Sequence, residues 1–125
     1  MNKYYNIKTK TSDGVVFDSH KEARRWEQLL LLQRAGKISH LERQVSYELI
    51  PNQYESYERF SKTGKRLKDG QRLVERKVNY VAYFRYTDTA TNETIVEDAK
   101  GFRTKEWVIK RKLMLYVHGI KVREV

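Results

Sequence analysis

The chain has 125 residues, a formal charge of +10, a sequence pI near 9.8, one proline and no cysteine. This length predicts one domain with a modest core, and the lack of cysteine excludes disulfides and thiolate zinc sites. Such a basic excess favours a polyanionic partner, of which nucleic acid is the commonest. Because the basic residues are spread along the chain and no long apolar run occurs, we expect a cytoplasmic protein and no membrane partner.

The first half of the chain predicts an arm, a helix and a strand. Residues 1–14 are polar and basic, and we expect a mobile arm or an edge strand there. Ser19 and Glu22 have the spacing of a capping box, which predicts the start of a helix. Apolar residues at helical spacing follow, and Gly36 predicts the end of that helix. Residues 43–50 alternate between polar and apolar side chains, which predicts a strand.

The second half of the chain begins with a basic insertion. The segment 52–72 contains turn signals and predicts a hairpin or loop. Residues 73–87 are rich in β-formers and predict a strand, which a turn connects to another strand ending at Lys100. Thr104 can cap a second helix, Gly119 predicts its end, and a final short strand follows at 120–125. This order of elements predicts an α/β fold, an α+β sandwich in which helices pack on one sheet.

The strand that ends at Lys100 carries the most informative short motif, Asp98-Ala99-Lys100. Side chains alternate along an extended strand, so Asp98 and Lys100 are expected on the same face. An acid and a lysine placed in this way can hold a divalent metal and bring a cation to the same phosphate. That is the minimal chemistry of a metal-dependent phosphodiesterase. The alternative is an incidental ion pair at a strand end.

Several further motifs accompany this tripeptide along the chain. They are Asp13-Gly14, Phe17-Asp18-Ser19, Lys21-Glu22-Ala23, Gln44, Tyr80-Val81-Ala82, Phe84, Val96 to Gly101 and Thr104-Lys105-Glu106. Together with the order of elements they resemble the PD-(D/E)xK nuclease superfamily, and within it a set of small phage and prophage domains of unknown function. The resemblance covers nearly the whole chain outside 52–72. It implies a restriction-endonuclease-like α-β-β-β-α-β core, a mixed sheet flanked by two helices, in a bacterial host cell.

The resemblance also implies a set of site residues. Glu22, Asp98 and the backbone carbonyl of Ala99 would hold Mg²⁺ or Mn²⁺, and Lys100 would stabilise charge during hydrolysis of a phosphodiester. Gln44 matches a strand glutamine that lies near the scissile phosphate in relatives. Other interpretations exist for two of these residues. Glu22 can serve only to cap its helix, and Gln44 can be an ordinary exposed strand residue.

Tyr83 departs from the pattern, because the resemblance expects a metal-binding aspartate at this position. A phenol has a reference pKa of about 10 and is neutral near pH 7, and the loss of one carboxylate weakens a magnesium site. Three functions stay open. The first is a metal-dependent DNA endonuclease, acting as a homodimer on branched or junction DNA by analogy with small phage resolvases. The second is a DNA-binding protein whose nuclease fold is inactivated at Tyr83. The third is an inhibitor or scaffold that binds another protein.

Two basic elements are expected to flank the predicted site, namely the insertion at 52–72 and the second helix. Lysine and arginine neutralise phosphates, and the tyrosine and phenylalanine rings of the insertion can stack on exposed bases. The alternative is a solvated loop that keeps the protein soluble. The residues predicted to contact nucleic acid are Lys62, Lys65, Arg66, Lys68, Arg72, Lys105, Lys110 and Arg111.

Overall fold

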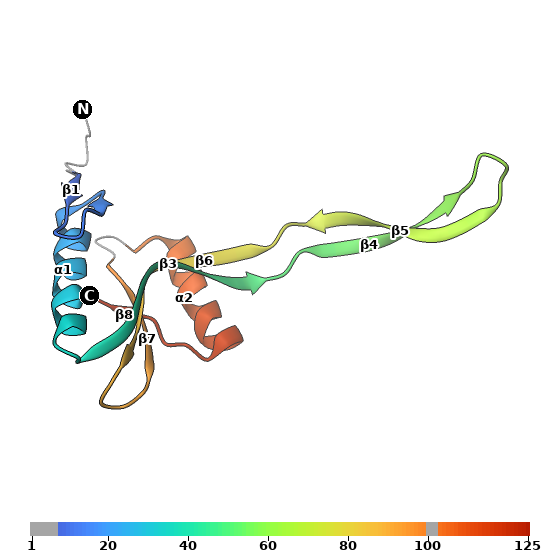
Figure 1. Cartoon of the computed structure of the whole chain (residues 1–125). Helices are drawn as coiled ribbons and strands as arrows, with labels where there is room; N and C mark the ends of the chain where they lie inside the picture. Colours follow the sequence, from blue (N-terminus) through green and yellow to red (C-terminus); the bar gives the residue numbers. More distant parts are fainter. Residues whose placement is uncertain (1–7, 100–102) are drawn as a thin grey trace.

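A four-stranded mixed sheet forms the centre of the computed structural model, which describes residues 8–99 and 103–125 (Figure 1). Its strands lie in the order β3 (Ile38–Ile50), β6 (Val78–Asp88), β7 (Thr94–Asp98) and β8 (Arg123–Glu124). β6 pairs antiparallel with both β3 and β7, whereas β7 and β8 are parallel. The predicted α+β fold, with one mixed sheet and two helices, is confirmed.

The two helices are α1 (His20–Arg34) and α2 (Lys105–His118). The side chains of Ser19 and Thr104 cap them, each accepting a hydrogen bond from the backbone N–H three residues later, at 3.2 and 3.0 Å. Gly119 ends α2 in the left-handed conformation, with φ of 67°. Both caps and this stop agree with the sequence prediction. Within the described part of the chain, neither helix is long and apolar enough to cross a membrane.

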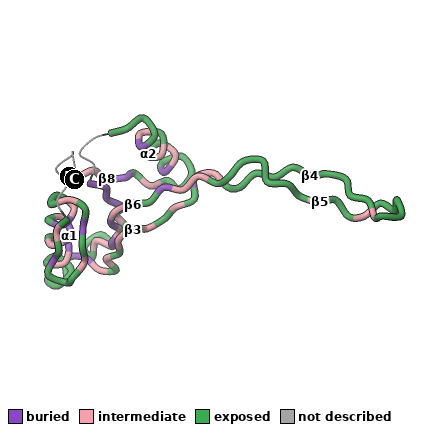
Figure 2. The backbone as a smooth tube through the Cα atoms, turned by 90° about the horizontal axis from the view of Figure 1, so that it is seen from above, coloured by how far each residue is buried: buried purple, intermediate pink, exposed green. Residues whose placement is uncertain are grey.

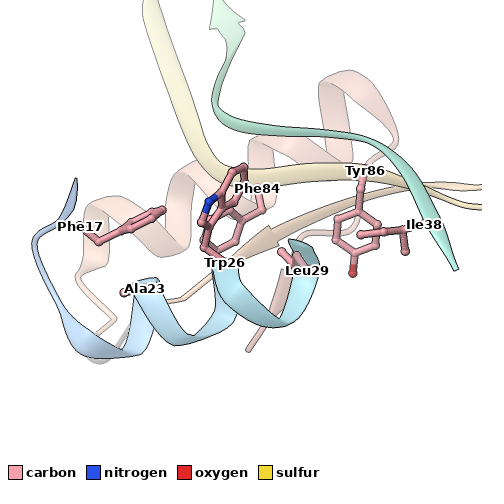
Figure 3. Close-up of a cluster of buried hydrophobic side chains, with 7 residues drawn as sticks. All are labelled: Phe17, Ala23, Trp26, Leu29, Ile38, Phe84 and Tyr86. Carbon is pink, nitrogen blue, oxygen red and sulfur yellow. The ribbon is translucent and has the colours of Figure 1, made fainter. Parts of the chain in front are cut away.

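Each helix covers its own cluster of buried side chains. The cluster under α1 consists of Phe17, Ala23, Trp26, Leu29, Ile38, Phe84 and Tyr86 (Figure 3). The cluster under α2 consists of Leu49, Tyr80, Ala82, Val96, Trp107, Met114 and Val122. Alternate residues of β6 therefore contribute to both clusters. Tyr80 and Ala82 belong to the cluster under α2, and Phe84 and Tyr86 belong to the cluster under α1.

Three strand boundaries differ from the prediction. The strand expected at 73–87 is divided, because β5 ends at Glu75 and pairs with one partner while β6 starts at Val78 and pairs with another. β3 begins at Ile38 instead of residue 43, since its first residues pair with the far end of β6. The final strand has only two residues, the stretch that pairs with β7.

A short ribbon precedes α1. β1 (Thr9–Lys10) pairs antiparallel with β2 (Val16–Phe17), so part of the predicted N-terminal arm is an edge ribbon. Residues 1–7, which belong to the same predicted arm, lie outside the described part of the structure.

The basic insertion is a hairpin made of β4 (Gln53–Phe60) and β5 (Arg66–Glu75), which we call the arm. Among the described residues, these two strands pair only with each other. Figures 1 and 2 both show the arm projecting from the end of the sheet where β3 stops and β6 starts. Every residue of β4 is exposed, as is nearly all of β5 (Figure 2).

Candidate functional site

A small cavity of about 40 Å³ lies where α1 starts beside β3 and β6. It has room for a water molecule or a metal ion and little more. The residues that line it are Val16, Phe17, Asp18, Glu22, Arg43, Gln44 and Tyr83. Three residues from the predicted site, Glu22, Gln44 and Tyr83, are therefore brought together although they lie far apart in the sequence.

The phenol of Tyr83 faces the carboxylate of Glu22 inside this cavity. Burial raises the pKa of Tyr83 to about 12, and the charge and hydrogen bond of Glu22 add to this effect, as does the charge of Asp98. Since its pKa lies so far above neutrality, Tyr83 keeps its proton and hydrogen-bonds to Glu22. The backbone N–H of Glu22 donates to Ser19, as a capping box requires. The side chain of Glu22 lines the cavity and contacts Tyr83.

Gln44 occupies an unusual backbone position for a residue in the middle of a strand. Its φ is 53°, although its neighbours Arg43 and Val45 keep their ladder positions opposite Phe84 and Ala82. A non-glycine residue held in the left-handed region costs on the order of 1–3 kcal/mol and persists only where the surrounding structure enforces it. Such strain is found preferentially at functional sites, and Gln44 lies at the cavity, although His40 in the same strand has a similar φ of 55° away from it.

Asp98 lies at the end of β7 and is completely buried. Its Oδ2 accepts hydrogen bonds from the hydroxyl of Tyr80 at 2.5 Å and from Nε1 of Trp107 at 2.8 Å. Its Oδ1 accepts the backbone N–H of Ala99 at 3.1 Å. Burial and the neighbouring Asp98 carboxylate raise the pKa of Tyr80, so this hydroxyl remains a donor. Neutral donors therefore satisfy Asp98 in the described structure.

The arrangement of the described residues does not fit a bound Mg²⁺ or Mn²⁺ ion. No group of three or more His, Asp and Glu side chains within residues 8–99 and 103–125 is placed to hold a metal. Asp98 and Glu22 both have protein partners, and Ala99 lines a different cavity of about 180 Å³ with Lys21 and Arg24. The predicted catalytic Lys100 lies outside the described residues.

The basic residues predicted on α2 are largely occupied by neighbouring acids. Lys110 forms an ion pair with Glu106 at 3.2 Å, one helical turn away. Arg111 lies 3.6 Å from Glu124 and stacks over the ring of Trp107, with 5.4 Å between the guanidinium carbon and the ring centroid. Lys105 is exposed at the start of the helix. α2 therefore presents less unpaired positive charge than its sequence predicts.

Three residues that lie at the site have no role there in the sequence prediction, although Asp18 and Tyr80 belong to the motifs that carry the resemblance. Asp18 lies at the cavity and adds negative charge near Tyr83. Tyr80 and Trp107 have the spacing of core residues and are indeed buried, but their polar ends converge on Asp98. Apolar periodicity places such side chains in a core and says nothing about where their hydroxyl or indole N–H points.

The fold and site define an α+β protein with a mixed sheet, two helices, a projecting basic arm and a small polar cavity at the start of α1. The chain belongs to the family described as "Protein of unknown function (DUF1064)", whose family model matches residues 1–124. It has no match among curated proteins or among solved structures.

Proposed function

We propose that the chain is a DNA-binding protein with a PD-(D/E)xK-like fold whose cleavage site is disabled by Tyr83. The observation that carries this proposal is the contact between Tyr83 and Glu22 in the cavity. A neutral phenol stands where the resemblance expects a carboxylate, and it engages the acid that would otherwise be available. We infer that a divalent ion is held weakly or not at all.

The surroundings of Asp98 support this inference. Magnesium keeps several waters and relies on one or two protein carboxylates, so each carboxylate in such a site is essential. In the described structure, a metal at Asp98 would compete with the hydrogen bonds from Tyr80 and Trp107. Breaking them would leave buried donors unpaired, at a cost of about 1–3 kcal/mol each.

The DNA-binding part of the proposal rests on charge. The chain carries a formal charge of +10, and its exposed arm carries six basic side chains against four acidic ones. Cations held in solvent attract a polyanion over distances near the Debye length and release its counterions on contact. Binding is therefore expected to weaken steeply as salt is added, which a protein that binds only another protein would not show with DNA.

Metal-dependent cleavage of DNA is the second candidate function. One observation favours it, because the cavity brings Glu22, Tyr83 and the strained Gln44 together with Asp98 nearby. An intact site of this type would require these predicted positions to lie close to one another. Lys100 would then stabilise charge on a phosphate, and branched DNA remains the candidate substrate by analogy alone.

A single-residue comparison separates the two functions. The protein as given, Tyr83→Asp and the uncharged control Tyr83→Asn are incubated with Mn²⁺, a four-way junction and a matched linear duplex. We expect the unchanged protein to bind without cutting. We expect Tyr83→Asp alone to be stabilised against thermal unfolding by Mn²⁺, because ligand binding to the folded state raises its stability. Tyr83→Asn reports the cost of losing the ring, so failure to fold is not mistaken for failure to bind metal.

The opposite result is equally clear. Mn²⁺-dependent cutting by the unchanged protein, abolished by Asp98→Asn, would overturn the proposal and establish a working nuclease. Manganese stabilisation of Tyr83→Asn as large as that of Tyr83→Asp would show that the ion binds elsewhere.

A further inference from the structure

Within residues 8–99 and 103–125, the arm has no hydrophobic core and no contact that covers either face. Its two strands pair only with each other, and every residue of β4 is exposed. Figures 1 and 2 show it extending well beyond the sheet from two directions. An isolated two-stranded hairpin is marginally stable in water, so the arm needs local contacts to keep its shape.

Those local contacts are present in the middle of the arm. The ring of Tyr57 lies over Gly70, where an added Cβ would come within 2.4 Å of the ring. The guanidinium of Arg72 covers the same ring at 4.8 Å and pairs with Glu55 on the opposite strand at 3.3 Å. An aromatic ring over a cross-strand glycine and an adjacent cation both stabilise a ribbon. Arg72 thus has a structural partner within the arm.

The tip of the arm is also held in one conformation. The backbone N–H of Ser61 donates to the carbonyl of Lys65, and the N–H of Lys65 donates to the Ser61 hydroxyl, at 2.8 and 3.0 Å. The N–H of Gly64 donates to the carbonyl of Ser61 at 2.9 Å, and its φ of 85° suits glycine. This turn presents Lys62 and Lys65 at the far end of the molecule.

The cations of the arm fall into two groups. Arg66 is paired with Asp69 at 2.8 Å and lies 3.8 Å from Glu58, so its charge is balanced locally. No ion pair within the described part of the chain involves the exposed cations Arg59, Lys62, Lys65 and Lys68. Their charge is therefore available to a partner outside the chain, and that partner is expected to be a polyanion.

We propose that the arm enters the major groove of duplex DNA, an inference that rests on the proposed DNA-binding function and specifies its substrate. The major groove of B-DNA is about 12 Å wide and admits a two-stranded β-ribbon. The ten residues of β5 span about 33 Å, close to one helical turn of DNA. The lysines at the tip lie where they can neutralise phosphates on either side of the groove.

The shape of the arm argues against two other nucleic acids. The major groove of A-form RNA is deep and narrow, so a ribbon of this width does not enter it. Single strands are usually held in a basic groove whose floor carries aromatic side chains. The arm is a projecting ribbon with both faces open, and Tyr54 and Phe60 are exposed without a groove around them. Duplex DNA is the polyanion that this shape fits.

The test measures binding to a duplex DNA of about two helical turns, a duplex RNA of the same sequence and the single DNA strand. Binding is followed over a range of salt in the presence of a chelator, so the result does not depend on metal or cleavage. Lys62→Ala/Lys65→Ala is compared with Arg34→Ala/Lys37→Ala, which removes the same charge from exposed residues beyond the other end of β3. The plot of log affinity against log salt has a negative slope. We expect the magnitude of this slope to decrease by about 1.8 for the arm variant, 0.9 for each lysine, and to change little for the control.

Each other outcome contradicts the proposal in a recognisable way. Equal slope changes in both variants would mean that the arm has no special role. Duplex RNA or single-stranded DNA binding as tightly as duplex DNA would exclude the groove interpretation. If the arm variant changed self-association and left DNA binding unchanged, the arm would bind a protein, such as a second copy of the chain. If the unchanged protein bound no nucleic acid at low salt, the proposed function itself would fail, whereas DNA cutting in the separate metal experiment would leave the arm result intact.

Discussion

Glu97 and Asp98 are neighbours in β7, and both carboxylates are completely buried. They differ in the groups that donate hydrogen bonds to them. On the α1 side, Arg25 holds Glu97 with two hydrogen bonds, Nε to Oε1 at 2.8 Å and NH2 to Oε2 at 2.6 Å, and the hydroxyl of Tyr86 donates to the same carboxylate. Hydrogen bonding to Glu97 raises the pKa of Arg25. On the other side, the described partners of Asp98 are all neutral donors.

This difference distinguishes Glu97, an acid with a structural role, from Asp98, an acid of the predicted site. A buried charge is costly unless it is paired and hydrogen-bonded, and Glu97 satisfies both conditions through Arg25. Asp98 satisfies only the second through its described contacts. The charge of Asp98 also acts on Tyr83, because it contributes to the raised pKa of the Tyr83 hydroxyl.

The largest expected effect comes from removing the cation on the α1 side. Arg25→Met should leave Glu97 buried without its countercharge and lower the free energy of unfolding by about 3 kcal/mol. This is the lower end of the usual range, because the Arg25 side chain is 24% exposed. Urea unfolding measures the loss, and Arg24→Met on the exposed face of the same helix is the control. A loss no greater than that of the control would show that Glu97 does not depend on Arg25.

A smaller effect is expected on the other side of the strand. Asp98→Asn keeps an oxygen that can accept from Tyr80 and Trp107, but its NH₂ group cannot accept the Ala99 N–H. We expect the free energy of unfolding to fall by about 1 kcal/mol, the net worth of one hydrogen bond. Asp69→Asn makes the same change on the exposed arm and serves as the control in urea unfolding. A loss as large as that of Arg25→Met would mean that a cation balances Asp98 after all, and the contrast would disappear.

Local signals in the sequence predict the helices well. The N-caps Ser19 and Thr104 and the left-handed Gly119 depend on residues within one turn, and all three are found where the sequence predicts them. Strand limits depend on distant partners and are predicted less well. The break between β5 and β6 occurs where the pairing partner changes from β4 to β3, and no local propensity reports that change.

The same reason explains what the sequence reveals about the site. Glu22, Gln44, Tyr83 and Asp98 could be singled out by resemblance. The structure brings the first three together at one cavity, and Asp98 acts on Tyr83 through its charge. The hydrogen bonds that Tyr80 and Trp107 donate to Asp98 join positions far apart in the chain. They depend on how α2 packs against β6 and β7, which follows from tertiary structure and not from local pattern.

The smallest effect is a loss of stability at alkaline pH, and it compares the tyrosine that donates to Glu97, Tyr86, with the tyrosine that faces Glu22, Tyr83. Burial, followed by interaction with a nearby glutamate, raises the pKa of Tyr86 and of Tyr83 to about 12, from an ordinary value of 10.0. Above pH 10 the unfolded chain releases these protons while the folded protein keeps them. Their stabilising contribution is therefore complete below pH 10 and is lost as the pH rises toward 12.

Denaturant unfolding between pH 9 and 12 tests this, with Tyr86→Phe and Tyr83→Phe compared with the unchanged protein. One fully coupled tyrosine would give a slope of about 1.4 kcal/mol per pH unit, and solvent screening should reduce it more for the half-buried Tyr83 than for the buried Tyr86. We therefore expect Tyr86→Phe to flatten the decline more strongly. Tyr116→Phe is the control, since that side chain is 87% exposed. If Tyr83→Phe reduced the loss of stability with pH more than Tyr86→Phe, the prediction would be wrong. The charges of Glu22 and Asp98 would then affect the unfolding free energy through Tyr83 more than the ion-paired Glu97 does through Tyr86.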